Sequence, residues 1–336
     1  MLPEARDCPP LELKDVNSKS FHKLILCGFL TVAMLATRQL NAQHLTLEGQ
    51  TGGFITPTAY VVYSAKDKFF SHPAVGYHFV NTAKVIGNVQ TFSITEGLGN
   101  KAEFGYTRNV HSMGDSVAFS KLWNYDGMNI FHGKFVALTE GTWNEKVPGI
   151  AAGFVVRTGD HYVSGALNKA IFGVDKAYTN YDLYVAATKT WLKPPVPLLL
   201  NFGWKATNAS IFGLGGQSTR LSGRFFGGLG IPLPLGHGLA AVPSAGFTQE
   251  PPQVKNLNLI LFPPGSKAHL PTTLDYAVRV TQKENPHFSF DIGIGQVAGQ
   301  IGYTAVATGV ANPPYIVIPV NLQARKVLGM GLSYRY

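Results

Sequence analysis

Cysteine is nearly absent from this 336-residue chain, and charged residues are scarce. Both cysteines, Cys8 and Cys27, lie near the N-terminus, so the rest of the chain can form neither a disulfide nor a cysteine-ligated zinc site. Charged residues make up 14% of the chain, whereas a soluble protein usually carries about a quarter. The net charge of +9 is spread without a basic block, which argues against a nucleic-acid-binding protein.

The sequence also lacks an apolar run long enough for a transmembrane helix, which needs about 20 residues. The run Leu24–Ala36 has only 13 residues. It follows two lysines and precedes a small-residue cleavage site, a pattern typical of a secretory signal peptide cleaved before Gln43. We therefore expect residues 1–42 to be an N-terminal extension and signal peptide, and residues 43–336 to form one domain in the outer membrane.

After residue 42, apolar residues recur at every second position, which is the period of a β-strand. The alternating segments run for about 9–13 residues, the length that a tilted strand needs to cross a bilayer. The face opposite the apolar one carries small and polar residues, as in a water-filled lumen. On the C-terminal strands this alternation predicts a lipid-facing set that comprises Phe288, Phe290, Ile292, Ile294, Leu328, Met330, Leu332, Tyr334 and Tyr336.

These patterns predict an all-β transmembrane antiparallel up-and-down β-barrel of about 12 strands, with ten or fourteen as alternatives. Short periplasmic turns and long extracellular loops, including 250–271 and 300–320, would connect the strands. The candidate strands are 53–63, 74–81, 85–97, 101–110, 128–139, 149–158, 181–191, 197–208, 219–233, 238–249, 272–283, 287–299 and 321–336. Because an even number is expected, one candidate is surplus. Segment 53–63 is the weakest, since glycine and proline interrupt it. Alternatively, residues 74–97 form one strand rather than two.

The stretch Leu47–Pro57 (LEGQTGGFITP) resembles the opening of a family of uncharacterised Gram-negative outer-membrane β-barrel proteins. The similarity covers most of residues 45–336. Four later stretches are also similar to that family: Ala102–Arg108, Pro148–Asp160, Asp182–Trp191 and Leu198–Gly216. The resemblance implies the barrel fold and the outer-membrane location. It implies no chemistry, because the family has no assigned activity.

The strand parities predict a net basic lumen. The inward-facing charged candidates are Lys134, Lys205, Arg220, Arg224, Arg279, Arg325 and Arg335, together with Glu103, Asp275 and Asp291. Arg279 and Asp291 lie on hairpin partners and are expected to pair. Two interpretations remain open, a ladder of ion pairs inside a filled barrel and a pore that favours anions. A wet lumen would also let Asp291→Asn assemble nearly normally.

The first functional hypothesis is a passive channel or solute-uptake, porin-like protein. The first alternative is a structural or surface-exposed barrel with a plugged lumen. A lipid hydrolase is the weaker alternative, because His287 and Ser289 should face the lumen rather than lipid. We expect no enzymatic activity, no cofactor and no metal site. The expected partners are outer-membrane lipid, lipopolysaccharide and the barrel assembly machinery, which would recognise the C-terminal strand ending at Tyr336; nucleic acid is not among them, and the sequence leaves the oligomeric state open.

Overall fold

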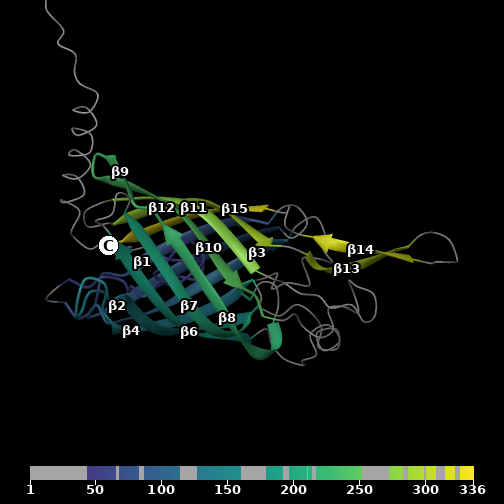
Figure 1. Ribbon diagram of the computed structural model, residues 1–336, viewed down its shortest axis with the longest axis horizontal. Coiled ribbons are helices and arrows are strands. Elements are labelled where there is room, and N and C mark those ends of the chain that lie inside the picture. The colour runs from purple at the N-terminus through teal and green to yellow at the C-terminus, as the bar shows by residue number, and fades with distance from the viewer. Residues whose placement is uncertain are drawn as a thin grey trace, which may run out of the picture. The chain divides into compact units, whose positions relative to one another are not determined.

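The computed structural model describes residues 44–65, 68–82, 87–113, 127–159, 179–191, 197–209, 211–213, 217–251, 272–282, 287–298, 300–307, 315–321 and 326–336. The predicted signal peptide lies outside these ranges. The described secondary structure is β-strand (Figure 1). Within the same ranges, no helix is long and apolar enough to cross a membrane.

Twelve strands form a closed antiparallel barrel. They are β1 (Ala74–Asn81), β2 (Gly87–Leu98), β3 (Ala102–Met113), β4 (Met128–Leu138), β5 (Gly149–Gly159), β6 (Thr179–Trp191), β7 (Leu198–Ala209), β8 (Gln217–Gly230), β10 (Leu239–Gln249), β11 (Thr272–Gln282), β12 (Phe288–Ala298) and β15 (Lys326–Arg335). Pairing of β1 with β15 and of β10 with β11 completes the ring. The short strand β9 (Leu233–Gly236) pairs with β10 alone. The predicted count of twelve is confirmed.

The outer face of the barrel is apolar because alternate residues of each strand point away from the lumen. On β12, Phe290 and Ile292 are 37% and 44% exposed, whereas the intervening Asp291 is fully buried. The same alternation leaves large apolar side chains outside on the other strands, among them Phe92, Phe104, Phe131, Leu183, Phe202, Phe225 and Leu332. The predicted sidedness is therefore confirmed, and the barrel is of the transmembrane type, with a lipid-facing exterior.

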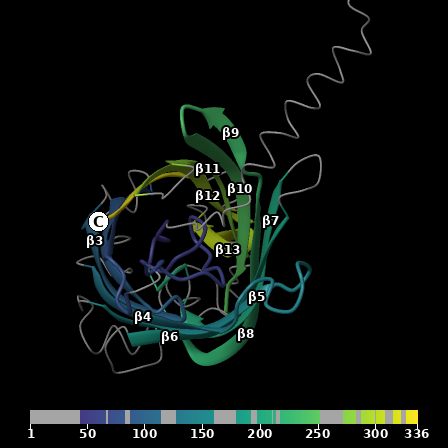
Figure 2. The same ribbon diagram turned by 90° about the vertical axis from the view of Figure 1, so that its left-hand side faces the viewer.

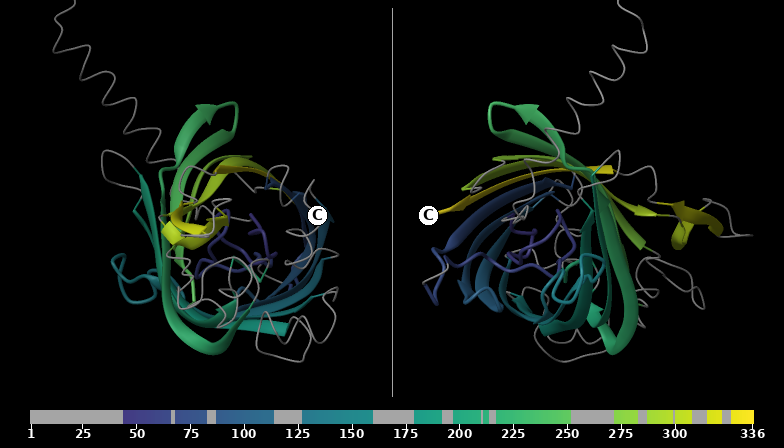
Figure 3. Two further views of the ribbon diagram at one scale, coloured as in Figure 1. Left: turned by 90° about the vertical axis from the view of Figure 1, so that its right-hand side faces the viewer. Right: turned by 60° about the vertical axis from the view of Figure 1, so that its left-hand side comes forward.

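The predicted strand 53–63 is wrong. It belongs to a segment, residues 44–64, that lies inside the ring of strands (Figures 2 and 3). We call this segment the plug; none of its residues is exposed. Isolated bridges Leu45↔Thr51 and Gly52↔Pro57 fold it back on itself. Gly49 has a φ of 90° in the first of these turns, a conformation that favours glycine. Such tight turns prevent the extended pairing that a wall strand requires.

The predicted long loop 300–320 contains two further strands. They are β13 (Gln300–Ala307) and β14 (Tyr315–Asn321), which pair with each other and not with the barrel. Figure 1 shows this hairpin at the end of the barrel opposite the C-terminus. The run Ile316-Val317-Ile318 is rich in β-branched residues, which favour extended pairing. The predicted long connection between the last two barrel strands thus contains a hairpin that adds no strand to the barrel.

Candidate functional site

The lumen is the candidate site, and its centre is an ion-pair network between the plug and β5–β6. Glu48 of the plug faces Arg157, with Nε–Oε1 at 2.5 Å and Nη2–Oε2 at 2.9 Å. The Arg157 side chain is fully buried, and its Nη2 also lies 2.9 Å from Oδ2 of Asp182. Asp182 in turn pairs with Lys205 at 3.3 Å and accepts a hydrogen bond from Thr207. This network stabilises a charge in the lumen that would otherwise be costly to bury.

A second buried pair holds the middle of the plug. Glu103 on β3 and Lys134 on β4 lie opposite each other in register, with their charged atoms 3.0 Å apart. The Glu103 carboxylate accepts hydrogen bonds from the backbone and hydroxyl of Thr51, at 3.0 and 2.6 Å, and from the backbone of Val62. Lys134 donates to the carbonyl oxygens of Thr51 and Thr58. Each charged wall residue therefore binds both its partner and the plug backbone.

A third anchor involves the predicted Arg279–Asp291 pair, which is confirmed. Arg279 Nε lies 2.9 Å from Asp291 Oδ1, and Arg279 also donates to the carbonyl of Gly52. Oδ2 of Asp291 is 2.6 Å from Nε2 of His44. Burial and the nearby Arg279 guanidinium lower the pKa of His44, so the neutral imidazole donates from Nε2 to Asp291. The expectation of a wet environment around Asp291 is wrong, because the plug excludes solvent from it.

A fourth anchor lies at the end of the barrel where the chain terminates. The Tyr60 hydroxyl donates to Glu140 over 2.5 Å, and Lys189 binds the other oxygen of the same carboxylate at 2.9 Å. The backbone N–H of Ala59 donates to the hydroxyl of Thr188. Burial, together with the hydrogen bond to Glu140, raises the pKa of Tyr60. The neutral phenol therefore remains a hydrogen-bond donor at physiological pH.

Small wall residues make room for the plug. A Cβ atom at Gly97 of β2 would overlap the carbonyl oxygen of Val62, and one at Gly329 of β15 would lie 2.5 Å from the ring of Phe54. Leu47, Phe54 and Ile55 of the plug form an apolar cluster together with wall residues. Gly97 and Gly329 are therefore places where the plug approaches the wall closely.

The other predicted lumen residues occupy varied positions. Arg224 lies opposite Lys205 in the β7–β8 register. Asp275 and Arg335 are buried, and the Arg335 guanidinium lies 5.6 Å from the ring centre of Tyr63. Arg220 is exposed. Arg325 lies outside the described residues.

The sequence reasoning missed Glu48, His44, Arg157 and Asp182. Arg157 and Asp182 have the inward parity of predicted strands and could have been found by extending the census along 149–158 and 181–191. Glu48 and His44 lie on no strand, so strand parity could not place them. Within the described lumen, Glu48 and Asp182 offset part of the positive charge of the predicted residues, whereas Arg157 adds to it.

Ser289 has a histidine partner, which is His44 of the plug and not the nearby His287. His44 Nδ1 lies 3.0 Å from the Ser289 hydroxyl, and Nε2 faces Asp291. His287 Nδ1 instead lies 2.9 Å from the carbonyl oxygen of Arg335. The order serine–histidine–carboxylate matches that of hydrolases. The Ser289 side chain is packed beneath the plug, however, and none of the three residues lines the cavity described next.

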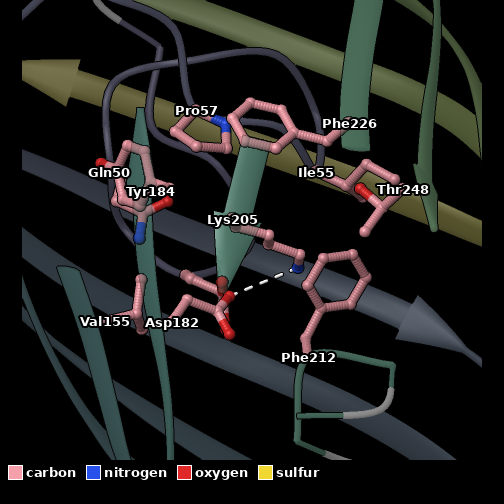
Figure 4. Close-up of a pocket in the computed structure, with 11 residues that line it drawn as sticks. Gln50, Ile55, Pro57, Val155, Asp182, Tyr184, Lys205, Phe212, Phe226 and Thr248 are labelled. Carbon is pink, nitrogen blue, oxygen red and sulfur yellow. Dashed lines mark hydrogen bonds and ion pairs between the residues drawn. The ribbon is translucent and has the colours of Figure 1, made fainter. Parts of the chain in front are cut away.

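A small cavity remains between the plug and the wall formed by β5–β8 and β10. Figure 4 shows Lys205 reaching toward Asp182, with Tyr184 and Gln50 on another side. The residues that line this cavity are Glu48, Gln50, Ile55, Pro57, Val155, Asp182, Tyr184, Lys205, Phe212, Phe226 and Thr248. Nε2 of Gln50 and Oη of Tyr184 are buried without a hydrogen-bond partner among the described residues. The cavity therefore offers polar atoms beside aromatic rings. Among the described residues, no group of His, Cys, Asp or Glu is arranged to hold a metal ion.

The stretches that carry the family resemblance coincide with the plug and its contacts. LEGQTGGFITP is the core of the plug itself. The four later stretches supply wall residues that bind the plug or support those that do: Glu103, Thr107, Arg157, Asp182, Thr188, Lys189, Asn201, Lys205 and Thr207. The glycine cluster and the charged residues of these stretches thus belong to one interface, at which the plug contacts the barrel wall.

Known structures give only weak similarities. A KdgM porin in complex with disordered oligogalacturonate is 8% identical, with a TM-score of 0.40, and the match covers 78% of this chain and 99% of that one. An outer membrane channel from Pseudomonas putida F1 is 11% identical, with a TM-score of 0.40 and coverage of 79% and 96%. The translocator domain of the autotransporter NalP from Neisseria meningitidis is 10% identical, with a TM-score of 0.37 and coverage of 95% and 98%. Similarities at this level carry no argument about function.

A search of curated proteins gave no match. The family comparison is more informative. Residues 42–224 match DUF3034, described as a protein of unknown function. The matched region contains the whole plug, β1–β7 and the part of β8 that pairs with Lys205. It spans more than half of the chain, and this protein therefore belongs to the DUF3034 family.

Proposed function

We propose that this protein is a porin-like outer-membrane channel whose plug, residues 44–64, holds the lumen closed, and that solutes pass when the plug is displaced. The observation that carries the proposal is the polar character of the plug–wall interface. Its centre consists of ion pairs and hydrogen bonds on Arg157, Glu103, Lys134 and Asp291. Such groups can be solvated by water once the plug leaves, as the wall of a wet pore requires.

Replacing the polar contacts of the plug by water costs little free energy, which favours a removable plug. A hydrogen bond in a protein contributes only about 0.5–1.5 kcal/mol net, because water replaces the lost partner. The wall strands keep their own backbone ladder around the whole ring without the plug. Release would expose three small apolar clusters at the plug–wall interface, around Leu47 and Phe54, around Leu45 and Val62, and around Ala59. The barrel itself should therefore remain folded when the plug moves.

A permanently plugged structural barrel is the second candidate. The close approach of Gly97 to Val62 and of Gly329 to Phe54 favours it, because such complementarity is typical of a fixed core. The two candidates differ in one observable property. A removable plug allows conductance that depends on plug movement, whereas a fixed plug allows none.

A reversible disulfide between the plug and the wall separates these candidates. A Cβ at Gly76 would lie 3.4 Å from the Cβ of Leu45, close to the separation that a disulfide needs. We would express the full chain with Leu45→Cys and Gly76→Cys in a background carrying Cys8→Ser and Cys27→Ser, and record planar-bilayer conductance. Reduced channels should show openings that disappear on oxidation and return with reductant. Each single-cysteine variant serves as a matched control, and its conductance should not change when the oxidant is added. Identical traces before and after oxidation, or no openings at all, would reject the removable plug.

Export and assembly form part of the same proposal. Residues 1–42 would direct secretion and be removed before Gln43, and the C-terminal strand ending at Tyr336 would engage the assembly machinery. Intact-mass measurement of protein from the outer-membrane fraction tests the cleavage. Retention of residues 1–42 in that fraction would refute it.

A further inference from the structure

We propose that Arg157 and Lys205 form a binding site for a small organic carboxylate, and that Glu48 of the plug occupies this site while the channel is closed. The inference rests on the proposed function, since a solute reaches Arg157 only after the plug moves. It adds a defined site and a chemical class of solute. Glu48 then acts as an internal competitor for the passing solute.

The geometry at Arg157 is that of a carboxylate receptor. Both oxygens of Glu48 face guanidinium nitrogens, at 2.5 and 2.9 Å, in the two-point arrangement that arginine offers to planar carboxylates. Arg157 is held in place from the wall by Asp182 on β6 and by Asn180, whose Oδ1 is 3.3 Å from Nη1. The receptor therefore belongs to the rigid barrel, whereas its present ligand belongs to the plug.

Among the charged anchors described above, only the site at Arg157 would carry a net positive charge after the plug leaves. The Glu103–Lys134 and Arg279–Asp291 pairs remain neutral without the plug. Among the residues that the structure describes, loss of Glu48 leaves Asp182 as the one carboxylate in ion-pair contact with Arg157 and Lys205.

Arg224 strengthens this local excess, because it lies opposite Lys205 on the neighbouring strand. Arg157 and Lys205, which then share Asp182, carry a net positive charge, and this charge favours binding of an anion from solution. The excess positive charge thus draws anions to the same point at which the two-point carboxylate geometry is found.

The adjoining cavity indicates what the rest of the solute looks like. The unpartnered hydroxyl of Tyr184 can donate to a second oxygen atom of the solute. The rings of Tyr184 and Phe226 pack edge to face, with centroids 6.2 Å apart, and provide an apolar wall beside Lys205. A carboxylate with a small carbon skeleton matches both features. Inorganic phosphate has no apolar part, so it would match the charged groups of the site but not the apolar wall.

The test compares two ways of loosening the plug in the full chain. Glu48→Gln removes the competitor from Arg157. Glu140→Gln, the matched control, removes a carboxylate that anchors Tyr60 at the far end of the plug and leaves the Glu48–Arg157 pair intact. Both variants should open more often than wild type in planar bilayers. Glu48→Gln should prefer chloride over potassium more strongly than Glu140→Gln, in which Glu48 can still return to Arg157, and benzoate should block its current at a concentration about tenfold lower than in Glu140→Gln.

A double variant and a second anion make the result decisive. Glu48→Gln with Arg157→Gln keeps the Asp182–Lys205 pair balanced, and it should conduct with neither the chloride preference nor the benzoate block. If neither Glu48→Gln, Glu140→Gln nor the reduced cysteine pair conducts, the proposed channel function fails. If they conduct but benzoate blocks Glu48→Gln and Glu140→Gln equally, the carboxylate site is overturned. Block by phosphate at lower concentrations than by benzoate would also overturn it.

Discussion

The two faces of the same twelve strands follow different rules. Outward positions on β12 need only be apolar, and Phe288, Phe290 and Ile292 meet that need without specific partners. Many inward positions instead have a particular polar contact; Asp291, for example, binds His44 and Arg279. The outer face touches a fluid solvent, lipid, whereas the inner face touches a folded segment of the same chain. Substitutions should therefore be judged by hydrophobicity outside and by individual partners inside.

The largest effect is expected from Arg157→Met. Removing one member of a buried ion-pair network leaves Glu48 without its cationic partner and Asp182 with Lys205 alone, which should cost about 3–5 kcal/mol of unfolding free energy. Urea titration of the vesicle-embedded protein measures this loss of unfolding free energy. The control is Arg108→Met on β3, whose guanidinium binds Asn129 in a partly exposed position, and which should lose about 1 kcal/mol or less. Equal losses would mean that the inner face is no more specific than the outer one.

A somewhat smaller effect is expected on the outer face. Ile292→Arg places a charge in the hydrocarbon region, and such a substitution near the midplane costs about 2–4 kcal/mol. Ile292→Leu is the matched control and should be nearly neutral. A cysteine at position 292 should also react with a lipid-soluble maleimide, whereas a cysteine at 291 should not. Reaction at 291 in preference to 292 would invert the assigned faces of β12.

The outer face was predictable from the sequence, because a strand with one face in lipid carries apolar residues at every second position. This alternation is visible in the sequence itself. The twelve wall strands and the Arg279–Asp291 pair followed from that period and from hairpin register. The plug did not, because a compact glycine-rich segment has no regular period, and its partners lie up to 289 positions away in the chain. Segment 53–63 shows the difficulty: its apolar residues alternate well enough to resemble a strand, but the bridge between Gly52 and Pro57 turns it inward.

A moderate effect is expected where the plug approaches the wall most closely. Gly97→Ala would place a methyl group against the Val62 carbonyl, and overpacking of this kind costs about 1–3 kcal/mol. Because the plug can move away from the wall, the variant should show faster proteolysis within residues 44–65 while the barrel stays folded. Gly149→Ala is the control, since its Cβ would meet Glu140 and Ala59 at ordinary contact distances of 3.4–3.6 Å. Plug cleavage that is equally slow in both variants would contradict a close fit at Gly97.

The smallest effect is expected at Ser289. Ser289→Ala removes one hydrogen bond to His44 Nδ1, which should cost about 1 kcal/mol or less, because the Ser333 hydroxyl lies 3.3 Å from the same nitrogen and can replace it. Ser289→Ala with Ser333→Ala should cost more than the sum of the two single changes, since the nitrogen then loses both partners. A role of Ser289 as a nucleophile gives a different result. Hydrolysis of a p-nitrophenyl ester by wild type, abolished in Ser289→Ala without loss of stability, would show that the inner face performs chemistry as well as holding the plug.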